Sequence, residues 1–193
     1  MTEVSREKAA LRQHMREVIR SVSSLRRPEA SAQIVAHLWP LLPTSGVVAL
    51  YAALPDEPDV DPLLAQLASE GRLALPRVDG DQLRLHLVTA HDELDAGSFQ
   101  IREPSDLDPT VAPEDLALAL IPGRSFDAAG RRLGRGGGHY DRLIAQMPAS
   151  VRRLGVAFSE QIVARVPTDS TDQPVHGVVT PQGLLEPGPS ESS

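Results

Sequence analysis

Apolar residues recur at helical spacing near the amino end of the chain. Between residues 5 and 23 they stand three or four positions apart, at Leu11, Met15, Val18 and Val22, which predicts an amphipathic helix. A second helix is predicted from Pro28 to Leu42, with the proline in its first turn.

Unbroken apolar runs at 47–54 and 116–122 predict strands that are buried on both faces, as in a parallel sheet. An Asp79-Gly80 turn between strands at 73–78 and 83–88 predicts a β-hairpin. The remaining expected elements are a helix around 63–69, a loop-rich stretch at 89–113, a helix at 139–147, and strands at 153–158 and 177–180. Strands that alternate with helices indicate an α/β fold, in which a mostly parallel sheet is flanked by helices on both faces. We expect a single domain over residues 1–185 and a disordered Pro/Ser/Gly-rich tail over 186–193.

Composition narrows the class of protein. The 193 residues carry a formal net charge of −7 and contain no cysteine, which excludes disulfides, thiolate nucleophiles and cysteine-based metal sites. The acidic balance argues against nucleic-acid binding, and no apolar run is long enough to span a membrane. The polar amino terminus does not resemble a signal peptide. We therefore expect a monomeric cytoplasmic protein whose partners are small molecules.

The basic residues are 18 arginines and a single lysine, Lys8. Because ammonium and guanidinium groups differ in shape and hydration, an isolated lysine points to a position that needs an ammonium. Lys8 lies at the edge of the apolar stripe of the first helix, and Arg12 faces the same way one turn later. The alternatives are a chance composition and a solvated helix face.

The segment RLGRGGGHYDR, residues 132–142, is the strongest local signal. Glycines allow a close backbone approach to a ligand, and Arg132 and Arg135 add fixed positive charge, so the segment predicts a phosphate-binding loop. It is neither a Walker A loop nor a Rossmann fingerprint. The alternative is a flexible turn with incidental arginines. Asp141, at the start of the following helix, suits either a helix-stabilising anion or a Mg²⁺ ligand.

Glu57 stands just after the first predicted strand, where α/β sheets bind ligands. Its carboxylate could accept hydrogen bonds from an amino-pyrimidine edge, or it could be a solvent-facing loop acid. The six histidines show no HExxH spacing and the chain has no GxSxG motif, which argues against zinc hydrolases and serine-triad enzymes.

Taken together in order, these segments resemble the 5-formyltetrahydrofolate cyclo-ligase (methenyltetrahydrofolate synthetase) family from about residue 8 to 181. The matching segments are Lys8-x-x-x-Arg12, ALYAALPDEPDVDPLL, LALPRV, IREP, LIPGRSFDAAGRRLGRGGGHYDRLI, LGVAFSEQIVARVP and TDQPVHGVVTP. The resemblance implies an α/β enzyme that uses ATP and Mg²⁺ to convert 5-formyltetrahydrofolate into 5,10-methenyltetrahydrofolate, with release of ADP and phosphate.

The resemblance also implies roles for individual residues. ATP would be bound by Lys8, Arg12, Arg132, Leu133, Gly134, Arg135, Gly136, Gly137, Gly138, His139 and Tyr140. The folate would be bound by Ala52, Glu57, Arg135, Gly136, Gly137, Gly138 and His139. Arg135 would lie near the transferred phosphoryl group as the catalytic residue, and Asp141 and Asp172 would hold Mg²⁺. Which of Tyr51, Phe126, Tyr140 and Phe158 packs against the pterin is left open.

The chain departs from the family pattern at two positions, because some members have lysine where Gly137 stands and tyrosine or phenylalanine where His139 stands. Two other classes of protein remain open on the sequence. One is a phosphate-ligand enzyme of the sugar-phosphate isomerase or CoA-transferase type, which would not need ATP. The other is a non-catalytic module that binds nucleotide or folate.

Overall fold

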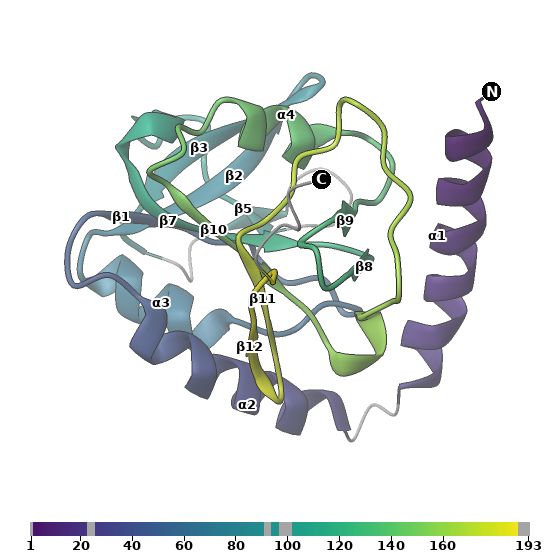
Figure 1. Cartoon of the computed structure of the whole chain (residues 1–193). Helices are drawn as coiled ribbons and strands as arrows, with labels where there is room; N and C mark the ends of the chain where they lie inside the picture. The colour runs from purple at the N-terminus through teal and green to yellow at the C-terminus, as the bar shows by residue number, and fades with distance from the viewer. Residues whose placement is uncertain (1, 23–25, 91–93, 97–101, 189–193) are drawn as a thin grey trace.

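Strands from residues 47 to 185 form one eight-stranded sheet in the order β12-β11-β10-β7-β1-β2-β3-β6 (Figure 1). In this computed structural model, which describes residues 2–22, 26–90, 94–96 and 102–188, neighbouring strands from β11 to β2 run parallel. Strands β12, β3 and β6 are antiparallel to their neighbours. The bounds are β1 Val47–Ala49, β2 Leu73–Asp79, β3 Gln82–Val88, β6 Thr110–Val111, β7 Leu116–Pro122, β10 Arg152–Val156, β11 Gly177–Thr180 and β12 Gly183–Leu185.

Helices cover both faces of this sheet. Helices α2 (Arg26–Leu38) and α3 (Asp61–Ser69) pack on one face, where Leu118 and Leu120 of β7 point into an aliphatic core. Helix α4 (His139–Ala145) packs on the other face, which receives the alternate residues Ala119 and Ile121. Because successive side chains of a strand point to opposite faces, an all-apolar run such as 116–122 requires this double cover.

Helix α1 (Glu3–Ser21) lies apart from these layers, alongside the short hairpin β8–β9 and the 3₁₀ turn η5 (Figure 1). Its apolar stripe buries Met15 and Ile19, and Lys8 is buried on the same side, as predicted. The remaining short elements are η1 (Trp39–Leu41), β4 (Asp95–Ala96), β5 (Arg102–Glu103), η4 (Pro113–Asp115), β8 (Ser125–Phe126), β9 (Arg132–Leu133) and η5 (Ser159–Gln161).

The predicted fold class is confirmed, including the β2–β3 hairpin, whose strands pair from Leu73↔Val88 to Asp79↔Gln82. Gly80 has a positive φ of 64° there, which suits a two-residue turn. The strand predicted at 47–54 is shorter in the structure. It ends at Ala49, and the rest of the apolar run lies outside the sheet. Most of that continuation is nevertheless buried, so burial alone could not distinguish it from a strand.

Several antiparallel pairings were not predicted. Strands β8 and β9 form a hairpin inside the glycine-rich connection, and β12 pairs with β11 at the sheet edge. In the stretch predicted as loop, β4 pairs with β5 and β6 pairs with β3. Residues 189–193 of the predicted tail, and residues 91–93 and 97–101 of the loop-rich stretch, lie outside the described part of the chain. Among the helices that the structure describes, none is long and apolar enough to cross a bilayer.

Candidate active site

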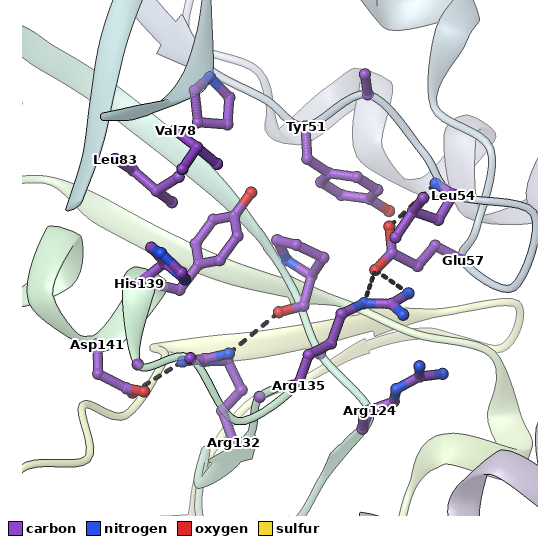
Figure 2. A pocket seen from close by; sticks show the side chains of 18 of the residues that line it. Tyr51, Leu54, Glu57, Val78, Leu83, Arg124, Arg132, Arg135, His139 and Asp141 are labelled. Carbon is purple, nitrogen blue, oxygen red and sulfur yellow. Dashed lines mark hydrogen bonds and ion pairs between the residues drawn. The ribbon is translucent and has the colours of Figure 1, made fainter. Parts of the chain in front are cut away.

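A cavity of 680 Å³ lies beyond the carboxyl ends of β1 and β7. Its walls are the segment after β1, the β2–β3 hairpin, the end of β5, and the segment from β9 to the start of α4 (Figure 2). Ligands of parallel α/β sheets bind at this end of the strands, and a cavity of this size accommodates a molecule as large as a pterin.

The glycine-rich loop (residues 134–138) connects β9 to α4 and forms one wall of the cavity. Gly136 and Gly138 have φ values of 115° and 69°, a region that side-chain-bearing residues rarely adopt. The Arg12 side chain on α1 reaches this loop, where its Nε donates a hydrogen bond of 2.9 Å to the carbonyl oxygen of Gly134. The first helix is therefore fastened to the loop at the site.

Lys8 lies one turn before Arg12, and its Nζ donates to the Oδ2 atoms of Asp169 and Asp172, both at 2.6 Å. Burial disfavours the ammonium form of Lys8, but the two carboxylates outweigh it and raise the pKa above its ordinary value. The hydrogen bond from Lys8, followed by those from Thr171, holds the pKa of Asp169 well below its usual range. Lys8 therefore carries a full positive charge next to the loop.

Arg135 projects from the loop towards the segment that follows β1 (Figure 2). Its Nη2 lies 2.6 Å from Asp56 Oδ1 and 2.7 Å from Glu57 Oε1, and Arg124 pairs with the other oxygen of Asp56. Burial opposes the charge on Arg135, but the field of Glu57 and the hydrogen bonds to both acids outweigh it and raise its pKa. The second oxygen of Glu57 accepts from the backbone N–H of Leu54 at 3.1 Å, so both oxygens of Glu57 are engaged.

Arg132 is buried beneath the loop with 4% of its surface exposed. Its Nη2 donates to Asp141 Oδ1 at 2.8 Å, and its guanidinium lies 5.8 Å from the centre of the Tyr140 ring (Figure 2). Burial, followed by the charge of Glu57, raises the pKa of the Tyr140 hydroxyl, which therefore stays protonated at neutral pH. Arg132 therefore links β9 to the start of α4, the two elements on either side of the glycine-rich loop.

Asp141 contacts the backbone next to Asp172, the other candidate metal ligand. Asp141 Oδ1 also accepts a hydrogen bond of 3.3 Å from the backbone N–H of Gln173, the residue after Asp172. Within the described ranges, no cluster of three or more His, Cys, Asp or Glu side chains could hold a metal. Mg²⁺ in phosphate sites needs only one or two carboxylates and takes its other ligands from phosphate and water. The pair therefore fits a metal ion that arrives with a nucleotide.

Comparisons with known proteins identify the family of the chain. The family model described as "5-formyltetrahydrofolate cyclo-ligase family" matches residues 4–181. The chain belongs to this family.

Individual relatives cover nearly the same length. The 5-formyltetrahydrofolate cyclo-ligase of Escherichia coli K12 is 31% identical over 77% of this chain and 85% of its own. The enzyme of the same name from mouse is 26% identical over 91% of this chain and 94% of its own. The solved structure of Aquifex aeolicus 5,10-methenyltetrahydrofolate synthetase has a TM-score of 0.83, with 34% identity over 96% of this chain and 95% of that one.

The structure brings together most of the residues that the family resemblance implicates. Those that line the cavity are Ala52, Glu57, Arg132, Gly134, Arg135, Gly137, Gly138, His139, Tyr140 and Asp141. Gly136, in the loop itself, and Lys8, Arg12 and Asp172 are not among the residues that line the cavity, and Leu133 is buried in the core. Their predicted roles in binding ATP, folate and Mg²⁺ stay predictions.

Sequence reasoning gave no role to four charged residues at the site: Asp56, Arg124 and Glu103, which stand within the quoted segments, and Asp169, which does not. The PDEP loop and the TD repeat near residue 170 are the only sequence signals that could have suggested two of them. Of the aromatic candidates, Tyr51 and Tyr140 line the cavity, whereas Phe126 and Phe158 are core residues.

The two departures from the family pattern are coupled in space. A Cβ atom at Gly137 would lie 2.6 Å from Nδ1 of His139, so the imidazole ring occupies the space that a side chain at 137 would need. Glycine at 137 and histidine at 139 therefore fit one another in this cyclo-ligase.

Proposed function

We propose that the protein is a 5-formyltetrahydrofolate cyclo-ligase that uses ATP to form 5,10-methenyltetrahydrofolate, with release of ADP and phosphate. The observation that carries the proposal is the convergence of Lys8 and Arg12, from the first helix, with Arg132 and Arg135 at one glycine-rich loop. That loop borders a cavity whose other walls include Tyr51, Leu54, Val78 and Leu83. A cationic loop beside an apolar cavity suits a triphosphate and a planar pterin side by side.

The chemistry requires activation of an amide. The formyl group is bound to N5 of the folate, and its oxygen attacks the γ-phosphorus of ATP. The bond between the γ-phosphorus and the β–γ bridging oxygen breaks, and ADP leaves. The neighbouring N10 then attacks the formyl carbon and loses its proton. Breakage of the carbon–oxygen bond releases phosphate and leaves the methenyl bridge. Phosphoryl transfer of this kind depends on positioning and charge neutralisation rather than on a protein nucleophile, in agreement with a chain that has no cysteine.

In this proposal, Lys8 and Arg12 bind phosphate oxygens of ATP, and residues 132–140 surround the nucleotide. Arg135 stabilises the charge on the transferred phosphoryl group. What supports the role of Arg135 is its position in the cavity wall, where Asp56 and Glu57 aim its guanidinium. Glu57 and Ala52 contact the folate beside it.

Asp141 and Asp172 would hold Mg²⁺ together with the phosphates of ATP. The ion would supply neutralisation of negative charge on the β- and γ-phosphates. Because Asp141 pairs with Arg132 and Asp172 with Lys8, each carboxylate has one oxygen engaged by a cation. Binding of Mg·ATP would transfer those cations from carboxylates to phosphates.

Incubation of the purified protein with Mg·ATP and 5-formyltetrahydrofolate tests the proposal. We expect the near-ultraviolet absorbance of the methenyl product to rise, with one ADP and one phosphate released per product. Reactions without ATP, and the Arg135→Ala variant, serve as controls. No rise with folded protein would refute the proposal. Turnover that does not need ATP would instead support an isomerase- or transferase-type enzyme, and binding of both ligands without phosphate release would support a non-catalytic module.

The monomeric state expected from the sequence also stays a prediction. Light scattering in the presence and absence of Mg·ATP tests it.

A further inference from the structure

Glu103, at the end of β5, is a buried acid in the cavity wall that the roles proposed above do not use. Only 2% of its surface is exposed, and the β2–β3 hairpin contributes Pro76, Val78 and Leu83 to the same cavity. A buried carboxylate costs free energy unless it is hydrogen-bonded, so a cavity that contains one is built for a polar partner.

The partners that Glu103 has within the described part of the chain are distant. Its Oε1 accepts from the backbone N–H of Val78 at 3.4 Å, and its Oε2 lies 3.8 Å from Arg77 Nη1. That Arg77 nitrogen donates instead to the carbonyl oxygen of Pro104, at 2.8 Å. A carboxylate can accept about four hydrogen bonds, so the contacts made by the described residues leave acceptor capacity on both oxygens of Glu103.

Glu57, the other carboxylate on the folate side, differs in this respect. Its oxygens are held at 2.7 Å by Arg135 and at 3.1 Å by the N–H of Leu54. Figure 2 shows Val78, whose backbone N–H donates to Glu103, together with Leu83 on the side of the cavity away from Arg124 and Arg135. Of the four acids that line the cavity, Asp56, Glu57 and Asp141 are hydrogen-bonded to arginines, whereas the described contacts of Glu103, on the hairpin side, leave it spare acceptor capacity.

We propose that Glu103 binds the amino-pyrimidinone edge of the reduced pterin and selects for it. This inference rests on the proposed function. The exocyclic 2-amino group and the ring N3–H of a pterin present two adjacent donors, which match the two oxygens of one carboxylate. The flat apolar faces of the ring suit Val78, Leu83 and Tyr140, which line the same cavity. Bound in this way, the pterin leaves its other edge, which carries N5 and the formyl group, directed away from Glu103.

The test compares Glu103→Gln with wild type on two substrates, 5-formyltetrahydrofolate and its analogue with hydrogen in place of the 2-amino group. Loss of charge-assisted hydrogen bonds should raise the KM for 5-formyltetrahydrofolate about 10- to 100-fold and leave the KM for ATP within about twofold. Wild type should prefer the amino substrate in kcat/KM by about tenfold or more, and the variant should lose most of that preference. Glu114→Gln, the same change on an exposed acid outside the cavity, is the matched control.

The outcomes separate this inference from the function itself. Wild type that is inactive on both substrates refutes the proposed function. Active wild type with an unchanged KM in Glu103→Gln, or a variant that slows both substrates equally, refutes the role of Glu103. If the variant does not fold, equilibrium binding of the two folates to wild type decides, because equal affinities for the amino and desamino compounds would overturn the inference.

Discussion

Replacement of Lys8 by alanine tests the contact that joins the site residues farthest apart in the sequence. The ammonium group is buried between Asp169 and Asp172, 161 and 164 residues away along the chain. Alanine removes the cation and leaves two neighbouring carboxylates without it. We expect the variant to fold but to lose most of its ATP turnover, through a higher KM for ATP.

Two magnitudes follow from the structure. For stability, removal of one partner from a buried ion pair costs about 3–5 kcal/mol. Here the side chain of Asp169 is 43% exposed and can be rehydrated, so we expect roughly 1–3 kcal/mol. For catalysis, loss of a charged hydrogen bond to phosphate costs about 1.5–3 kcal/mol, which corresponds to a rise of about 10- to 150-fold in the KM for ATP. The two freed carboxylates repel the triphosphate as well, so the upper part of this range is expected.

The assay follows methenyl formation at several ATP concentrations, with circular dichroism as the check on folding. Arg6→Ala is the matched control, because it removes one positive charge from an exposed position of the same helix. We expect Arg6→Ala to behave as wild type. A folded Lys8→Ala enzyme with a KM for ATP within twofold of wild type would refute the reasoning that the lysine serves the nucleotide.

Three further predictions use other parts of the structure. Arg135→Lys keeps a positive charge but loses the two-pronged guanidinium group, so steady-state kinetics should show kcat reduced about 10- to 100-fold with a smaller change in the KM for ATP. An unchanged kcat would contradict the role of Arg135 in stabilising the charge on the transferred phosphoryl group. The pKa of Asp169 lies below its ordinary value of 3.8, so its stabilising effect is complete above that pH and is lost as the pH falls below it. The difference in melting temperature between wild type and Asp169→Asn should therefore be largest near neutrality and shrink below about pH 4. A difference that grows as the pH falls would contradict this prediction. In Gly155→Ala, the new Cβ would lie 2.6 Å from the Phe126 ring, so urea unfolding should show a free energy of unfolding that is lower by about 1–3 kcal/mol. Gly188→Ala is the control and should show no such loss, because no described atom lies within 4 Å of the new Cβ.

Much of the fold follows from periodicity in the sequence. The run at 116–122 identified the central strand β7 because it is apolar on both faces, and the first helix was expected within two residues of its observed bounds. Short elements were harder to predict, since β8 and β9 have two residues each and carry no period. The segment after Ala49 reads as strand because it is buried, yet the backbone N–H of Leu54 bonds to Glu57 rather than to a neighbouring strand. Tertiary contacts decided that case.

The candidate site was predicted less completely than the fold. The glycine-rich loop and Lys8 stand out by composition, and a resemblance to a family added their roles. Asp169 has only the weak signal of the TD repeat and Glu103 has none, because acids are common in this chain and only the folded structure brings these two to Lys8 and to the cavity. Burial is what distinguishes Glu103 from the many exposed acids.

The span of chain between Lys8 and Asp172 has a consequence for biosynthesis. A nascent polypeptide can form its first helix early, but it has no acceptor for the ammonium until residues 169–172 have been synthesised and the strands on either side of them have joined the sheet. Contacts that close so large a loop form late in folding. Incomplete or half-folded chains would consequently lack the contact of Lys8 with Asp169 and Asp172, and with it the nucleotide site that we propose.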